Sequence, residues 1–182
     1  KRVLLQVLEE FDHKHLNLDL PYFERQIPTS ENVARVLWDK LQAQPDIGTL
    51  QRLSLYEDED LCADLTAEAG PEVASVTRRY SFTAVHDGHR GHTWDLFVSV
   101  HGPIDRETGM VTDIVALDHL LKERVLVPFD GRDLRMVLAT PSVTGEYLAK
   151  AVWDRIASAI PAGTLQLVKL VQTRDLFYEY AG

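Results

Sequence analysis

The spacing of apolar residues predicts a hairpin, two helices and a second hairpin in the later part of the chain, and helices followed by a hairpin in the earlier part. Residues 80–86 and 93–100 alternate apolar and polar positions, and a short polar stretch with two glycines connects them, which is typical of a β-hairpin. Four further strands are expected at residues 50–57, 60–65, 165–172 and 175–180. The stretch 66–72 is a convincing linker, because turn-forming and polar residues replace the alternation there.

Helical spacing of apolar residues predicts two helices for each half. Ile114, Leu117, Leu121 and Val125 share one face of a first helix, and residues 1–7 are expected to be the tail of its equivalent. A second helix should begin after Thr29, a suitable N-cap residue, with its twin after Thr144. The order hairpin, helix, helix, hairpin predicts an α+β fold, with an antiparallel sheet and two helices on one face.

The two halves also repeat one another in sequence. From Thr29 onward the offset between matching positions is constant at 115 residues, which is the size of a small domain. The copies differ where chemistry would lie, since His13, Ser30 and Glu57 match Gly131, Gly145 and Gln172. We interpret this pattern as a duplication followed by specialisation.

The repeat suggests how the chain divides into domains. The stretch from about residue 76 to residue 118 has no counterpart ahead of Lys1. We therefore expect residues 1–65 to be the C-terminal half of a first unit, residues 66–73 a linker, and residues 74–182 a complete second unit. On this interpretation the other half of the first unit lay upstream in a longer protein.

Composition narrows the possible partners and the compartment. Hydrophobic residues make up 45% of the chain and charged residues 26%, as in folded cytosolic proteins, so a cytoplasmic location is expected. The net charge of −9 argues against nucleic acid, because phosphate binding needs clustered lysine and arginine. No membrane-spanning run or signal-peptide pattern is present, and the single cysteine, Cys62, excludes an internal disulfide framework.

Several motifs together resemble the 6-pyruvoyl-tetrahydropterin synthase and 6-carboxytetrahydropterin synthase family. They are Ala84-Val85-His86, Gly91-His92-Thr93-Trp94, Gly109-Met110-Val111-Thr112-Asp113, Phe11 to Asn17, Pro28 to Ala34, and a strand that ends in Glu57. The resemblance implies the tunnelling fold, in which units close side by side into a barrel and active sites form between units. It also implies a symmetric homo-oligomer and a zinc-dependent lyase of the pterin or deazapurine pathway that acts on dihydroneopterin triphosphate.

The resemblance assigns roles to individual residues. Glu57 would anchor the aminopyrimidine edge of the pterin by accepting two parallel N–H bonds. Asp12 and His13 would form the proton-relay pair, in which the aspartate fixes the imidazole tautomer. Thr29 and Glu31 are either pocket residues or helix-capping residues.

The zinc ligands implied by the resemblance are His86, His89 and His92, since three imidazoles with an open position form a catalytic zinc pattern. Two features depart from the family. Arg90 stands where the family has a histidine, unless His89 substitutes for it, and the hairpin loop lacks the family's cysteine. The alternative interpretation is a set of histidines on an exposed polar turn. Cys62 lies elsewhere and reads as a small buried side chain rather than a nucleophile.

Two functions stay open on the sequence. One is a lyase whose site combines the relay pair and Glu57 of the first copy with the histidines of the second. The other is a protein whose catalytic equipment has decayed, and which binds a pterin or purine without turnover or serves as an oligomeric scaffold.

Overall fold

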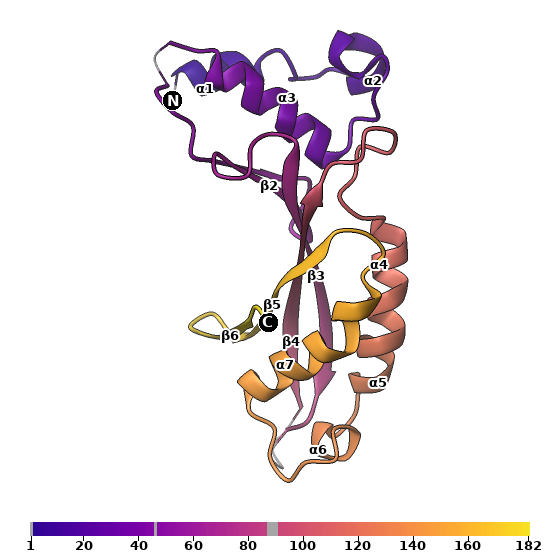
Figure 1. The fold of residues 1–182 in the computed structure, drawn as a ribbon. Coiled ribbons are helices and arrows are strands. Elements are labelled where there is room, and N and C mark those ends of the chain that lie inside the picture. Colours follow the sequence, from indigo (N-terminus) through magenta and orange to yellow (C-terminus); the bar gives the residue numbers. More distant parts are fainter. Residues whose placement is uncertain (1, 46, 87–90) are drawn as a thin grey trace. The chain divides into compact units, whose positions relative to one another are not determined.

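The computed structural model describes residues 2–45, 47–86 and 91–182 (Figure 1). The first half of the chain holds α1 (Arg2–Leu8), α2 (Leu16–Asp19), the 3-10 helix η1 (Pro21–Phe23), α3 (Ser30–Gln42), β1 (Arg52–Tyr56) and β2 (Leu61–Thr66). The hairpin strands are β3 (Val73–Ala84) and β4 (His92–Pro103). The second half continues with α4 (Ile114–Leu121), the π-helix η2 (Lys122–Leu126), α5 (Val127–Phe129), α6 (Leu134–Val137), α7 (Gly145–Ile156), η3 (Ala157–Ala159), β5 (Thr164–Thr173) and β6 (Leu176–Tyr180).

The predicted α+β class is confirmed. The strands follow the order β1-β2-β3-β4-β5-β6 in one sheet, and both terminal hairpins are antiparallel. Their registers obey the sequence repeat, because Leu55 pairs with Ala63 in β1–β2 and Leu170 pairs with Tyr178 in β5–β6. The offset of 115 residues therefore holds for both partners of each pair.

Packing divides the chain into two compact units. Unit 1 consists of Lys1–Val76 and His101–Val111, and unit 2 of Thr77–Val100 and Thr112–Gly182. This division cuts through the long strands β3 and β4. The boundaries expected from the repeat, at residues 65 and 74, follow the sequence and stay a prediction.

In unit 1, α3 packs on β1 and β2. The helix begins as predicted, since the Thr29 hydroxyl accepts a hydrogen bond from the backbone N–H of Asn32 at 3.2 Å. Val7, Leu37 and Leu41 form its buried hydrophobic cluster. Unit 1 thus uses the apolar face that the helical spacing predicted for α3.

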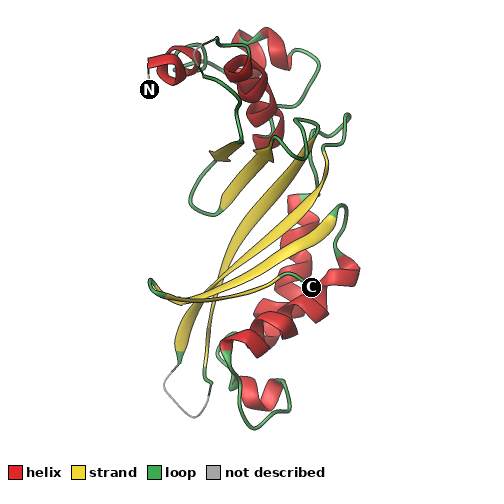
Figure 2. Cartoon of the chain, turned by 60° about the vertical axis from the view of Figure 1, so that its left-hand side comes forward, coloured by secondary structure: helices red, strands yellow, loops and turns green. Residues whose placement is uncertain are grey.

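In unit 2, the helices cover one face of the long strands (Figure 2). Leu117 and Leu121 of α4 and Leu148 and Val152 of α7 are fully buried, as their spacing predicted. Alternating apolar residues of the strands, such as Leu96 of β4, are fully buried as well. This is the larger and better-packed core of the chain.

The helical stretch that follows Asp113 changes from α to π geometry in η2. Pro128 has no backbone N–H, so it cannot bond to the carbonyl of Arg124 in the preceding turn. The guanidinium of Arg155 donates to that carbonyl at 3.1 Å and stacks over the Phe129 ring at 4.8 Å. A side chain from α7 therefore satisfies the group that the proline leaves open.

The hairpin strands are longer than the alternation predicted. Thr77 and Ser99 share a hydrogen bond of 2.7 Å, and Arg79 is paired with Asp95 at 3.1 Å. Charged residues that pair with one another across the two strands interrupt the hydrophobic pattern without interrupting the sheet. In the described part of the chain, no helix is both long enough and apolar enough to span a bilayer.

Candidate active site

The motif residues Thr29 to Asn32 lie at the N-terminus of α3, where four backbone N–H groups lack helical partners. Ser30, Glu31 and Asn32 are all buried, with exposed fractions of 7%, 4% and 4%. Burial of three consecutive polar residues is costly unless each finds partners. Their contacts therefore indicate what this helix start is built to hold.

One set of contacts fixes the connection after β4. The Thr29 hydroxyl donates to the carbonyl of Gly109 at 2.5 Å, and the Asn32 amide donates to the carbonyl of Ile27 at 2.8 Å. Gly109 has a φ of +74° and no room for a β-carbon, which would collide with the Asn32 amide. Both the backbone conformation of this turn and its close approach to α3 therefore require a glycine at position 109.

Glu31 belongs to the same set of contacts. Its carboxylate accepts the backbone N–H of Val111 at 3.0 Å. Burial raises the pKa of Glu31, and the nearby charge of Glu57 raises it further. The hydrogen bond from Val111 lowers the pKa in part, but the net shift is upward. The structure therefore gives Glu31 a buried position that ties residue 111 to the helix start, while Thr29 serves as the N-cap. The contact of Thr29 and Glu31 with a substrate stays a prediction.

Glu57 follows β1 and is exposed, unlike Glu31. The Ser30 hydroxyl donates to Glu57 Oε2 at 2.6 Å, a short charge-assisted hydrogen bond. Among the described residues this is the side-chain hydrogen bond that Glu57 accepts, and because the residue is exposed, its carboxylate is open to further donors. A carboxylate held in this way suits a pair of parallel N–H donors.

The equivalent place in unit 2 is filled. Gly145 and Gln172 replace Ser30 and Glu57, so the hydroxyl and the carboxylate are both absent. A β-carbon on Gly145 would collide with the ring of Tyr178, whose counterpart in unit 1 is the small Ala63. The second copy therefore has neither the charge nor the space of the first.

The predicted relay pair lies on an exposed turn of unit 1. His13 Nε2 is 3.8 Å from Asp12 Oδ1, and the side chains are 94% and 72% exposed. His13 has a φ of +53°, and its twin Gly131 has a φ of +68°. A left-handed conformation costs a histidine roughly 1–2 kcal/mol, whereas a glycine adopts it freely. Unit 1 therefore has a histidine at a position where the backbone conformation favours glycine.

The structure brings two of the three predicted zinc ligands together in unit 2. The rings of His86 and His92 have centroids 5.4 Å apart, and the His86 ring lies 5.3 Å from that of Trp94. Two imidazoles that share a zinc, at about 2.0–2.1 Å from one nitrogen of each ring, have centroids within roughly 6 Å of one another, and the His86–His92 separation lies in that range. His89 lies outside the described residues. Within residues 2–45, 47–86 and 91–182, no group of three potential metal-binding side chains gathers.

Cys62 is buried, as predicted, with 7% exposure. Burial, with the Asp64 charge beside it, raises the pKa of the thiol to about 11. The thiol is therefore protonated at neutral pH, and a thiolate is the nucleophilic form of cysteine.

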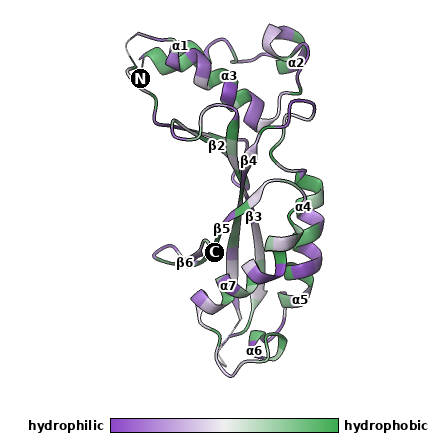
Figure 3. Cartoon of the chain, in the orientation of Figure 1, coloured by the Kyte–Doolittle hydropathy of each residue, from purple (hydrophilic) through white to green (hydrophobic). Residues whose placement is uncertain are grey.

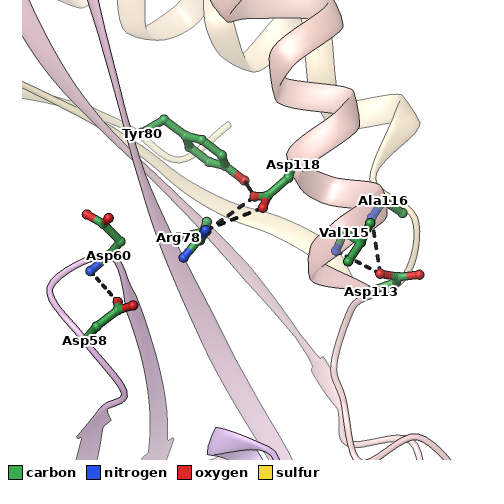
Figure 4. A network of polar contacts seen from close by, with 8 residues as sticks. All are labelled: Asp58, Asp60, Arg78, Tyr80, Asp113, Val115, Ala116 and Asp118. Atoms are coloured by element: carbon green, nitrogen blue, oxygen red, sulfur yellow. Dashed lines mark hydrogen bonds and ion pairs between the residues drawn. The ribbon is translucent and has the colours of Figure 1, made fainter.

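A hollow on unit 2 lies apart from all the predicted site residues. It has a volume of about 440 Å³ and is lined by Arg78, Tyr80, Asp118 and Lys122, among others. Asp118 accepts hydrogen bonds from Tyr80 at 2.8 Å and from Arg78 at 3.3 Å, as Figure 4 shows. Arg78, Tyr80 and Asp118 therefore pair with one another in the wall of the hollow, which Leu126 and Val127 also line.

Comparison with known proteins identifies the family. The family model for 6-pyruvoyl tetrahydropterin synthase matches residues 1–68 and 76–182, in two segments that together cover most of the chain. The chain belongs to this family. The suspected resemblance is thereby confirmed.

Individual relatives support the assignment. A 6-pyruvoyl tetrahydrobiopterin synthase of Pongo abelii is 32% identical over 134 residues, which cover 60% of this chain and 92% of the relative. One of Drosophila melanogaster is 30% identical over 136 residues, covering 60% of this chain and 80% of the relative. The solved structure of Caenorhabditis elegans 6-pyruvoyl tetrahydropterin synthase matches with a TM-score of 0.56 at 23% identity, covering 60% of this chain and 96% of that one. That match supports the fold.

The sequence missed one residue of this site. Ser30 was part of a recognised motif, but its bond to Glu57 was not foreseen. A signal was present, because Ser30 and Glu57 change together to Gly145 and Gln172 between the two copies. Paired replacement within one chain is the pattern expected of residues in contact.

Proposed function

We propose that the protein is a pterin synthase-like lyase that acts on dihydroneopterin triphosphate with zinc. The observation that carries the proposal is the 2.6 Å hydrogen bond that holds the Glu57 carboxylate at the start of α3, in a member of this family. The aminopyrimidine edge of a pterin presents two parallel N–H donors, and a fixed carboxylate matches them.

Each end of the substrate has a proposed partner. Glu57 would accept the N–H donors of the ring, while Ser30 holds its other oxygen. His13, with Asp12 beside it, would take up and return a proton of the substrate side chain at a ring nitrogen. His86, His92 and His89 would hold the zinc, which when bound supplies a Lewis acid for the side-chain hydroxyls. The similarity to 6-pyruvoyl tetrahydrobiopterin synthases supports the pyruvoyl product, and the carboxy product is the second branch of the proposal.

Calorimetric titration with neopterin tests the binding half of the proposal. We expect one site per chain, because the Ser30–Glu57 arrangement occurs once and Tyr178 fills its counterpart. Two equivalent sites per chain, or none, would contradict this assignment. Binding without release of triphosphate would support the alternative of a pterin-binding protein that lacks turnover.

Metal analysis tests the zinc half. Purified protein should carry about one zinc per chain, and His92→Ala should remove it, since His92 lies within 5.4 Å of His86. Stoichiometric zinc that persists in the His86→Ala/His92→Ala double variant would remove these histidines from the assignment.

We also propose a symmetric homo-oligomer with a cytoplasmic location. The strand β6 ends the sheet and exposes Leu176 and Phe177, with exposed fractions of 42% and 51%. An edge strand with exposed apolar residues favours pairing with another chain. A monodisperse monomer of the full-length protein in light scattering would contradict the proposed assembly.

A further inference from the structure

The turn that carries Asp12 and His13 depends on the residues on either side of it. Both side chains are largely exposed, so packing of their own cannot fix their positions. His13 also has a φ of +53°, a conformation that an L-residue keeps only where its surroundings impose it. The contacts of the neighbouring residues therefore determine where this imidazole lies.

A polar cluster holds the chain ahead of the turn. Lys40 Nζ, in the last turn of α3, donates to Glu10 Oε2 at 2.6 Å, and the Tyr22 hydroxyl donates to the same oxygen at 3.2 Å. The Lys40 ammonium also lies over the Tyr22 ring, 4.5 Å from its centroid. Each of the three residues therefore contacts the other two, and we call Lys40, Glu10 and Tyr22 the lysine clamp.

The lysine clamp reaches the turn through Glu10 and Phe11. The Tyr22 ring stacks on that of Phe11, with centroids 6.3 Å apart and an angle of 21° between the ring planes. The two residues directly ahead of the turn are thus both held by side-chain contacts. Beyond the turn, the Asp19 carboxylate accepts the N–H of His15 at 2.8 Å. The chain is therefore fixed where it enters the turn and where it leaves it.

The helix α3 gives the lysine clamp a packed support. Its apolar residues Leu37 and Leu41 are buried, and Figure 3 shows both green and purple stretches along this helix. The Lys40 side chain is only 20% exposed. Its hydrogen bond lowers the pKa of Glu10, so that carboxyl is ionised at neutral pH. An isolated ion pair on a surface contributes little, whereas a pair within a ring of three contacts restricts the chain that it joins.

The second copy keeps a cation at the same place. By the repeat offset of 115 residues, Lys40 corresponds to Arg155, which also lies in the last turn of its helix. Arg155 lies 4.8 Å over the ring of Phe129, the counterpart of Phe11, and donates to the carbonyl of Arg124 at 3.1 Å. In both units, then, this cation holds the chain ahead of the turn. The turn that follows in unit 2 has no histidine.

We propose that Lys40, Glu10 and Tyr22 are positioning residues for the proton relay, which fix the turn so that the His13 imidazole meets the side chain of the bound substrate. This inference rests on the proposed function for the reaction, and on the contacts of the lysine clamp for the geometry. The lysine clamp acts on the proton transfer and not on binding of the ring, because Glu57 is held by a separate hydrogen bond.

The two units supply a test that separates positioning from stability. Lys40→Met removes the charge and keeps an unbranched side chain, whereas Lys40→Arg keeps the cation, as unit 2 does. Arg155→Met is the matched control, since it breaks the corresponding contacts beside a turn without histidine. NMR order parameters of the Asp12 and His13 backbone amides are measured for these variants and the unaltered chain, together with the kcat and KM of triphosphate release and the affinity for neopterin.

The effects should be confined to Lys40→Met. The order parameters of the two turn amides should fall from about 0.85 to below about 0.6 in this variant, and should be unchanged in Lys40→Arg and Arg155→Met. The kcat should fall by about 10- to 100-fold, the scale of a misplacement of about 1 Å, while KM and the affinity for neopterin stay the same.

Two results would overturn the proposal. One is a set of order parameters that does not change in Lys40→Met. The other is an equal loss of kcat in Lys40→Met and Arg155→Met, because the lysine clamp would then act through stability alone. If the unaltered chain releases no triphosphate, the proposed function fails, while lowered order parameters in Lys40→Met would still support the lysine clamp as the element that holds the turn.

Discussion

Replacing Glu57 by glutamine tests the site at the level of one atom. The variant keeps the shape of the side chain and one acceptor oxygen, but it loses the negative charge and replaces the second oxygen with an N–H donor. In the native protein Ser30 donates to Oε2, and on the proposed function the second oxygen accepts from the ligand. The glutamine must either turn its N–H group to Ser30, whose hydroxyl would then accept instead of donate, or present that N–H group to the donors of the pterin.

The expected loss is that of one charge-assisted hydrogen bond, about 1.5–3 kcal/mol, which corresponds to neopterin binding about 10- to 150-fold weaker. Calorimetric titration of neopterin measures it directly. Gln172→Ala is the matched control and should change the affinity little, because Gly145 and Tyr178 leave the second copy without a hydroxyl and without space. Equal losses in the two variants would refute the view that the copies are specialised.

Three further predictions concern the scaffold of the site. Thr29→Ala should destabilise the protein by about 1 kcal/mol more than Thr144→Ala in urea unfolding, because both lose an N-cap and only Thr29 also bonds to Gly109; equal losses would contradict this role of Thr29. Gly109→Ala should cost about 1–3 kcal/mol more than Gly70→Ala, since both have positive φ but only Gly109 meets Asn32 and Thr29; similar midpoints would show that the turn can move. Glu31 has a raised pKa in the native state, so the native state binds its proton more tightly than the unfolded state. The free energy of unfolding should therefore fall as the pH rises from below 4.5 through the raised pKa. A Glu31→Gln variant should lack this part of the fall, and parallel pH profiles of the urea midpoints of the two proteins would contradict the raised pKa.

Local patterns predicted the elements because their causes are local. The apolar spacing of Leu37 and Leu41 gave the buried face of α3, and Thr29 is the N-cap that its side chain and position predicted. The strand limits were less accurate for β3, because Arg78 and Arg79 interrupt the alternation. Their partners, Asp118 and Asp95, are distant in sequence, so the pattern alone could not show that the strand continues.

The contacts of the site could be predicted only in part. Sequence motifs named Thr29, Glu31 and Glu57, but not the bonds that Thr29 and Glu31 make with Gly109 and Val111, 80 residues away. Such contacts depend on the fold and leave no local periodicity. The closure of the second copy by Tyr178 was likewise hidden, because a tyrosine in a strand reads as an ordinary β-former.

The central claim is that the protein turns over a pterin triphosphate, and release of inorganic triphosphate from dihydroneopterin triphosphate tests it most directly. The assay is run on the chain with zinc supplied. We expect release that His13→Ala abolishes while neopterin still binds, since the proposed function gives the proton transfer to His13 and the ring to Glu57. Tight neopterin binding with no release would contradict the lyase and leave a pterin-binding protein.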